Sequence, residues 1–224
     1  MGSREYGQFC GLARAAEVLG QRWTMLILRD LLVGPRRYSD LVAGLPGIPT
    51  NLLATRLKEL ERDGIVVREA RDRPDRSIVY RLTARGADLG PALDALGRWG
   101  AATMHAPRDG EIVTDASLTT ALRVAAQGGR APDQQSVTYT IRAGDAVAHA
   151  VVRGRQVEVA PGESPSPDLV LTAGPGFRDL LAGAITPEEA LADGSVEITG
   201  DPDLLDAFAA TFVVPYATRA LDNR

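Results

Sequence analysis

Cysteine and histidine are scarce in this chain of 224 residues. The single cysteine, Cys10, excludes an intramolecular disulfide and a zinc site built from several cysteines. The two histidines, His105 and His149, are too few for an ordinary histidine-rich metal centre. The sequence also lacks a Ser-His-Asp set, a carboxylate pair within a motif and a glycine-rich phosphate loop. We therefore expect no metal, no cofactor and no enzymatic activity.

Long apolar runs are missing as well. No run approaches the ~20 residues that would span a bilayer, and residues 1–5 contain no apolar signal core. We therefore expect a cytoplasmic protein with no membrane partner. The composition, 45% hydrophobic and 24% charged, is that of an ordinary globular chain.

Charge is unevenly distributed along the chain. Up to Glu111, 17 Lys and Arg residues stand against 14 Asp and Glu, a net charge of +3; from Ile112 onward, 8 stand against 15, a net charge of −7. A mildly basic half joined to an acidic half suggests that only the first half meets a polyanion. Because the secondary-structure pattern changes near the same place, we expect two domains, residues 1–108 and 112–220.

Helical periodicity runs through much of the first half. The expected helices cover residues 12–19, 23–32, about 41–45 and about 51–63. In the second of these, Trp23, Leu26, Ile27 and Leu31 are expected to share a buried face. Thr50 is a plausible N-cap for the fourth.

The fourth expected helix has two distinct faces. Leu53, Leu57 and Leu60 recur at i, i+4 and i+7, which is typical of a buried stripe. At about 100° per residue, the opposite face carries donors that can meet base edges and phosphates. These donors are Asn51, Thr55, Lys58 and Arg62. Such a face on an isolated helix is more often merely solvated, so its neighbours in the sequence matter.

Two strand-like runs, residues 65–69 and 77–82, follow this helix directly. The polar turn between them carries Arg71, Arg73 and Arg76. Helix, turn, helix and then a hairpin with a basic tip is the order of a winged helix-turn-helix domain. In that geometry the second helix of the pair enters the major groove of DNA, and the hairpin lies along the backbone or in the minor groove.

The first half resembles the HxlR-type winged-helix transcriptional regulators. The matching residues are Cys10, Gly20-x-x-Trp23-Thr24-x-x-Ile27-Leu28, Gly34-Pro35-x-Arg37-Tyr38-x-x-Leu41, Leu45-Pro46-Gly47-Ile48, Leu53-x-x-Arg56-Leu57-Lys58-Glu59-Leu60-Glu61-x-Asp63-Gly64, Tyr80-x-Leu82-Thr83-x-x-Gly86 and Trp99. The resemblance covers nearly the whole first half in the correct order. It implies a homodimer that binds a roughly palindromic double-stranded DNA operator.

The resemblance also implies roles for particular residues. Thr50, Asn51, Thr55, Arg56 and Lys58 would face the groove, Arg36, Arg37 and Ser39 would contact phosphate, and Arg71, Arg73 and Arg76 would form the wing. A helix expected from Ala84 to about His105, with Pro91 bending it or lying in its first turns, would dimerise together with the N-terminal helix. Some members of the family sense electrophiles or oxidants through a cysteine at the position of Cys10, the alternative being a partly buried, inert thiol.

The second half shows the period-two alternation of strands. Val137, Tyr139 and Ile141 are expected on one face, and the alternation recurs at Val147/His149/Val151, Val157/Val159, Leu169/Leu171 and Val196/Ile198. This predicts about five mostly antiparallel strands with one apolar face. Covering helices are expected from Phe177 to near Gly183, from a capping box at Thr186 to Ala192, and from Leu204 to about Phe212.

This half resembles the sterol carrier protein type of lipid-binding domain. The resemblance rests on Pro167-Asp168-Leu169-Val170-Leu171, Leu180-Leu181-Ala182-Gly183, Ala190-Leu191-Ala192-Asp193-Gly194 and Ile198-x-Gly200-Asp201. It implies an apolar tunnel for a hydrophobic small molecule, fatty-acyl or sterol-like. The expected lining is Val137, Tyr139, Ile141, Val147, Val151, Phe177, Leu180, Leu181, Leu191, Phe208 and Phe212. A fully packed core without a cavity is the alternative.

The sequence thus predicts an α+β protein with a winged helix-turn-helix domain followed by a sterol carrier protein-like domain. Its leading interpretation is a homodimeric transcriptional regulator that a hydrophobic effector controls. One alternative is a lipid carrier or acyl-handling protein whose first half serves dimerisation or protein docking. Another is a regulator that senses thiol oxidation through Cys10, with the second half as structural support.

Overall fold

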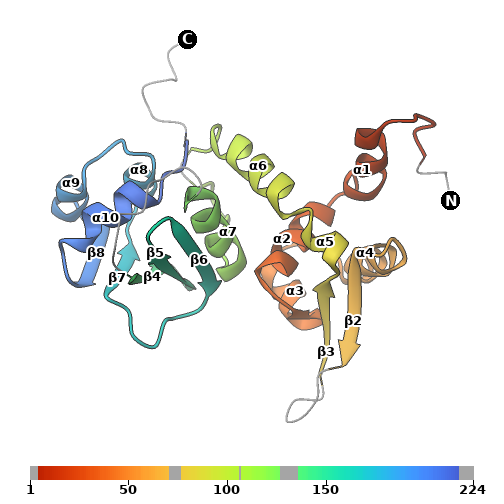
Figure 1. Cartoon of the computed structure of the whole chain (residues 1–224), viewed down its shortest axis with the longest axis horizontal. Helices are drawn as coiled ribbons and strands as arrows, with labels where there is room; N and C mark the ends of the chain where they lie inside the picture. The colour runs from red at the N-terminus through yellow and green to blue at the C-terminus, as the bar shows by residue number, and fades with distance from the viewer. Residues whose placement is uncertain (1–4, 71–76, 106, 127–135, 217–224) are drawn as a thin grey trace. The chain divides into compact units, whose positions relative to one another are not determined.

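A computed structural model describes residues 5–70, 77–105, 107–126 and 136–216. The chain divides into two compact units, Met1–Leu93 and Asp94–Arg224, each with its own hydrophobic core (Figure 1). The division falls earlier in the chain than the predicted domain limits, 1–108 and 112–220, which stay a prediction. None of the helices in the described part of the chain is long and apolar enough to cross a membrane.

The first unit combines helices with a small antiparallel sheet. Its elements are α1 (Gly11–Leu19), α2 (Thr24–Val33), β1 (Arg36–Arg37), α3 (Tyr38–Gly44), α4 (Thr50–Arg62), β2 (Val66–Ala70), β3 (Ile78–Leu82), α5 (Ala84–Ala87) and the start of α6 (Gly90–Ala101). The sheet order is β1-β3-β2, with Arg36 opposite Tyr80 and Val66 opposite Leu82. This order of elements confirms the predicted winged helix-turn-helix pattern.

The core of the first unit forms where α2, α3 and α4 bury their apolar stripes. Leu53, Leu57 and Leu60 of α4 are at most 2% exposed, as their spacing predicted. In α2 the buried apolar residues are Ile27, Leu28 and Leu31. Leu26, which was expected on that buried face, is 42% exposed, so this prediction was wrong.

Two predicted helix boundaries also need correction. Thr50 is the first residue of α4 and not its N-cap; Pro49 holds the cap position in extended conformation. The single helix expected from Ala84 to His105 is two helices, because α5 ends at Ala87 and α6 begins at Gly90. Pro91 lies in the first turn of α6, where its missing N–H breaks no hydrogen bond of the helix.

The second unit is a five-stranded sheet with helices. After the remainder of α6, its elements are α7 (Asp115–Ala126), β4 (Ser136–Ala143), β5 (Ala146–Arg153), β6 (Gln156–Pro161), β7 (Leu169–Ala173), α8 (Phe177–Leu181), α9 (Pro187–Ala192), β8 (Val196–Gly200) and α10 (Leu204–Thr211). The sheet order is β6-β5-β4-β7-β8 (Figure 1). Only the β4–β7 pair within this order is parallel, which confirms the mostly antiparallel prediction.

Strand β5 presents the opposite face to the one that the sequence predicted. The buried positions are Ala146, Ala148, Ala150 and Val152, whereas Val147, His149 and Val151 are only partly buried. Both alternating sets are apolar enough to enter a core, so periodicity alone could not choose between them. The strand register decides which set is buried. Tyr139 pairs with Ala150 and Ile141 with Ala148, and cross-strand partners lie on the same face of the sheet.

Helix α7 (Asp115–Ala126) was not predicted from the sequence. Leu118, Leu122 and Ala125 are buried at i, i+4 and i+7 and join the core of the second unit, where α7 contacts β5 and β6. Thr114 and Ser117 hydrogen-bond each other's backbone and side chain at its start. The apolar spacing of Leu118, Leu122 and Ala125 after a Thr-x-x-Ser cap is the sequence pattern that predicts this helix.

Candidate nucleic-acid interface

The exposed face of α4 carries the residues that the helical spacing selected. Asn51, Thr55, Lys58 and Arg62 are all exposed, opposite the buried leucines. The Thr55 hydroxyl donates to the backbone carbonyl of Asn51 at 2.9 Å, and Arg62 Nε donates to Asp63 Oδ1 at 3.1 Å. Lys58 forms no ion pair with any residue that the structure describes. Its ammonium group is therefore available to an external anion.

The start of α3 lies beside the start of α4. The Tyr38 hydroxyl donates to the Thr50 carbonyl at 2.6 Å and so joins the two helices at their N-terminal ends. Arg37 and Ser39 are exposed next to this bond, and Arg36 is half-buried in β1. The structure thus gathers these three predicted phosphate contacts around the end of α4 that begins with Thr50 and Asn51.

A buried carboxylate of α2 lies within electrostatic reach of Arg36. Asp30 of α2 is 2% exposed and accepts from Nε and Nη2 of Arg29 at 2.8 and 2.7 Å. Burial raises the pKa of Asp30, and the positive charges of Arg29 and Arg36 oppose that rise. Arg36 is therefore close enough to the buried Asp30 carboxylate to lower its pKa, while its own side chain is only half-buried.

Arg56 lies away from the exposed face of α4. Only 13% of its side chain is exposed, and its guanidinium donates to the Glu59 carboxylate and, at 3.1 Å, to Gln21 Oε1. The resemblance had implied that this residue faces the groove. The structure instead places it between α4 and the turn that joins α1 to α2.

The two wing strands pair over their whole length, with Val67 opposite Arg81 and Glu69 opposite Val79. Arg81 bonds the carboxylate of Glu69 across them. Arg68 of β2 is exposed, and the sequence analysis did not single it out. The predicted tip residues Arg71, Arg73 and Arg76 lie outside the described residues.

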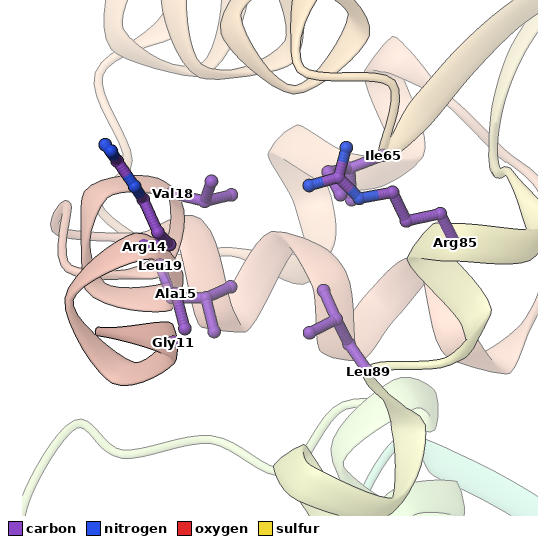
Figure 2. A pocket seen from close by; sticks show the side chains of 8 residues that line it. All are labelled: Gly11, Arg14, Ala15, Val18, Leu19, Ile65, Arg85 and Leu89. Carbon is purple, nitrogen blue, oxygen red and sulfur yellow. The ribbon is translucent and has the colours of Figure 1, made fainter. Parts of the chain in front are cut away.

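A groove runs along α1 within the first unit (Figure 2). Its volume is about 260 Å³, and its lining is Gly11, Arg14, Ala15, Val18, Leu19, Ile65, Arg85 and Leu89. Figure 2 shows α1 on one side and Ile65, Arg85 and Leu89 on the other. Arg85 also donates to the carbonyl of Asp63, the C-cap residue of α4, at 3.3 Å. Cys10 is exposed immediately before α1.

The predicted ligand-binding residues of the second unit come together only in part. Tyr139 packs at ring-centroid distances of 5.4 Å from Phe208 and 6.1 Å from Phe212, and Phe177 stacks on Phe208 at 6.2 Å. Burial raises the pKa of Tyr139 to about 12, with a smaller contribution from Asp168. Val137, Ile141, Leu180 and Leu181 belong to the same core.

The remaining members of that predicted lining lie elsewhere. Val147 and Val151 are on the opposite face of the sheet, because the register turns Ala148 and Ala150 to the core. Leu191 of α9 is 40% exposed. The ring Nδ1 of His149 lies 2.9 Å from the carbonyl oxygen of Gly162, which links β5 to the residue that follows β6.

Comparison with known proteins gives matches to DNA-binding regulators. A family model described as HxlR-like helix-turn-helix matches residues 18–108. An uncharacterized HTH-type transcriptional regulator of Synechocystis sp. is 36% identical over 96 residues, which are 43% of this chain and 71% of that protein. The uncharacterized HTH-type transcriptional regulator YvaP of Bacillus subtilis is 38% identical over 86 residues, 38% of this chain and 80% of that one. The solved structure of the reduced form of the regulator YodB from B. subtilis has 33% identity, covers 42% of this chain and 92% of that chain, and gives a TM-score of 0.37.

Proposed function

Because the chain belongs to the HxlR-like helix-turn-helix family of DNA-binding transcriptional regulators, we propose that it binds a palindromic operator as a homodimer under the control of a hydrophobic effector. The observation that carries the DNA-binding part is the exposed polar face of α4, backed by three buried leucines. No enzymatic step is involved, and the regulator works on DNA in the cytoplasm.

On a duplex, α4 enters the major groove as the recognition helix. The amide of Asn51 suits the paired donor and acceptor of an adenine edge, and Lys58 and Arg62 suit phosphates. Arg37 and Ser39, held beside the start of α4 by the Tyr38–Thr50 bond, suit the phosphates that flank the groove. The exposed Arg68 adds a positive charge on the wing.

Exposed apolar side chains support a dimer. In the first unit, the exposed large apolar residues include Tyr6, Phe9, Leu12, Met25 and Leu26; in the second, Leu96 and Trp99 of α6 are 49% and 77% exposed. Apolar surface of this extent is more typical of a protein interface than of a solvated helix. A second copy of the chain is the occupant that we propose, with the groove along α1 as part of the contact.

The test of DNA binding uses a duplex selected by the wild-type protein from a random-sequence library. Asn51→Ala should weaken binding to this duplex by about tenfold and relax base preference at one position of each half-site. Lys58→Ala should weaken binding to all sequences and lower the slope of log affinity against log salt by about 1 per subunit. Fluorescence anisotropy at several salt concentrations measures both.

Arg155→Ala is the matched control, since Arg155 is an exposed arginine of the second unit. Unchanged affinity in both α4 variants would place the DNA-binding surface elsewhere. Salt-insensitive or absent DNA binding by the wild type would favour the rival interpretation, a lipid carrier whose first unit only dimerises or docks on a protein.

The effector would bind in the apolar core of the second unit, between the β4 face of the sheet and helices α8 and α10. Tyr139, Phe177, Phe208 and Phe212 pack against one another there, so a hydrophobic ligand would have to displace these rings in order to bind. Native mass spectrometry of purified protein should report a dimer with a bound hydrophobic molecule. A dimer of bare protein mass, unchanged when a fatty acid such as oleate is added, would argue against the effector.

The exposed thiol of Cys10 favours a second candidate input, oxidation. Diamide should then release the wild type from the selected duplex and leave Cys10→Ser bound. Equal behaviour of the two proteins would remove oxidation of Cys10 as the input.

A further inference from the structure

Arg56 makes the contacts of a structural residue inside a DNA-binding helix. Its guanidinium bonds Glu59 one turn later in α4 and Gln21 Oε1 at 3.1 Å, 35 positions earlier in the chain. The side chains of Arg56 and Glu59 are 13% and 12% exposed. The guanidinium fork thus spans two partners, one within α4 and one outside it.

Gln21 belongs to a constrained turn. The turn between α1 and α2 brings Trp23 to φ 78°, the one non-glycine residue with positive φ among those described. This conformation is unfavourable for a bulky residue and persists only where the surroundings enforce it. Trp23 packs against the core of the first unit, and the guanidinium carbon of Arg22 lies 5.3 Å from its ring centroid. The position of Gln21 is therefore well defined.

A contact between Arg56 and DNA would require both of these bonds to break. The Glu59 carboxylate would then lose the Arg56 cation while remaining largely buried, which is strongly unfavourable. Thr55 and Lys58, its neighbours on α4, are already exposed and reach outward at no such cost. The geometry thus separates residues that meet the duplex from one that holds the helix.

We propose that Arg56 is a positioning residue, which fixes the recognition helix α4 to the α1–α2 turn through Gln21. This inference rests on the DNA-binding function proposed above. The Tyr38–Thr50 bond fixes the start of α4, and the Arg56–Gln21 bond fixes its middle. Together they set the angle at which Asn51 and Lys58 are presented to a groove.

The Arg56–Gln21 hydrogen bond also couples the position of α1 to that of the recognition helix α4. Helix α1 ends at Leu19, two residues before Gln21, and it lines the groove in Figure 2. A displacement of α1 moves the turn, and through Arg56 it moves α4. Gln21 therefore contributes to operator recognition without contacting the operator.

The decisive variant is Gln21→Ala, which removes the acceptor and changes neither the charge nor any residue of α4. It should lower affinity for the selected duplex on the order of tenfold. Its affinity for duplexes of unrelated sequence and its salt slope should equal those of the wild type, because no phosphate contact is lost. Gln21→Glu keeps an acceptor oxygen and should retain wild-type affinity. Gln8→Ala, an exposed glutamine of the first unit, is the matched control.

Arg56 itself is tested with a conservative change. Arg56→Lys keeps the positive charge but loses the fork that reaches two partners. It should show the same loss for the selected duplex and the same unchanged salt slope as Gln21→Ala. The double variant Gln21→Ala/Arg56→Lys should bind the selected duplex no more weakly than Arg56→Lys alone, since both changes remove the same Arg56–Gln21 hydrogen bond. Circular dichroism and the fluorescence of Trp23 verify that each variant is folded.

Three outcomes separate the possibilities. Wild-type affinity in Gln21→Ala overturns the positioning role. A further variant, Arg56→Ala, removes the positive charge that Arg56→Lys keeps; a lower salt slope in Arg56→Ala, with Gln21→Ala unaffected, identifies Arg56 as a phosphate contact and also overturns the positioning role. If Lys58→Ala and Asn51→Ala are without effect as well, the DNA-binding surface itself is misplaced, which is a failure of the proposed function and not of Arg56 alone.

Discussion

Asp30 places a carboxyl group inside the first unit, with 2% of its surface exposed. Two hydrogen bonds from Arg29 and the charge of Arg36 favour the ionised form, but the loss of hydration outweighs them, and the pKa is raised. The folded state therefore holds the Asp30 proton more tightly than the unfolded state does. The ionised carboxylate is a local destabilising element beside β1 and α3.

This shift gives a pH dependence with a definite sign. The stabilising contribution of protonated Asp30 is full below the unfolded-state pKa and is lost as pH rises through the raised folded-state pKa. Asp30→Asn cannot titrate, so wild type should lose stability relative to this variant as pH rises from about 4 through the raised folded-state pKa of Asp30. Urea unfolding followed by Trp23 fluorescence measures the difference. A constant difference at all pH values would contradict the prediction; Asp88→Asn, at an exposed site, is the control.

At the scale of elements, α5 approaches the residue that opens the wing closely enough to require glycine. A Cβ on Gly86 would lie 2.2 Å from the backbone oxygen of Ile65. Thr83 fixes the same approach, because its hydroxyl accepts from the Gly86 N–H at 3.1 Å and donates to the Gly64 carbonyl at 2.7 Å. The nearest atoms to that Cβ are the backbone of Ile65 and the Cβ of Leu82, so no side-chain rotamer change can make room for a methyl group.

Gly86→Ala should therefore destabilise the first unit by about 2 kcal/mol or more, the usual cost of overpacking against backbone. The matched change Gly100→Ala in α6 meets no atom within 4 Å and should raise stability by up to about 1 kcal/mol, because alanine suits a helix better. Thermal and urea unfolding distinguish the two. Equal stability of both variants would mean that α5 shifts freely away from Ile65.

At the scale of the whole molecule, the division between the units falls inside α6, after Leu93. From Asp94 onward, α6 is held to α7 by a bidentate ion pair, with Arg123 Nε 3.0 Å from Asp94 Oδ2 and Nη2 2.7 Å from Oδ1. Arg98 adds a bond to the carbonyl of Val124. The Asp94 side chain is 6% exposed and that of Arg123 28%.

Asp94→Ala leaves Arg123 largely buried without this partner and should destabilise the second unit by about 2–3 kcal/mol. Each unit carries one tryptophan, so Trp99→Phe and Trp23→Phe backgrounds report the first and the second unit separately. The loss should appear in the Trp99 signal. Glu158→Ala breaks an exposed pair with Arg153 and should cost no more than about 0.5 kcal/mol. A loss confined to the Trp23 signal would assign this part of α6 to the first unit.

Much of the molecule was predictable where the signal is local. The leucine spacing in α4 predicted both its buried stripe and its exposed face, because a helix repeats every 3.6 residues whatever surrounds it. The capping box of Thr186 and Glu189 predicted the start of α9 in the same way. Signals of this kind lie within one turn of the chain and need no tertiary contact.

The sequence by itself determined the winged-helix pattern of the first unit, the mostly antiparallel strands of the second and the polar face of α4. Tertiary structure alone decided that Ala148 and not His149 enters the sheet core, since strand register follows from pairing with β4. It also decided that Arg56 turns inward, because its partner Gln21 lies 35 positions away. Contacts between residues far apart in the sequence leave no periodic pattern in it. They depend on which helices and strands pack together after each has formed.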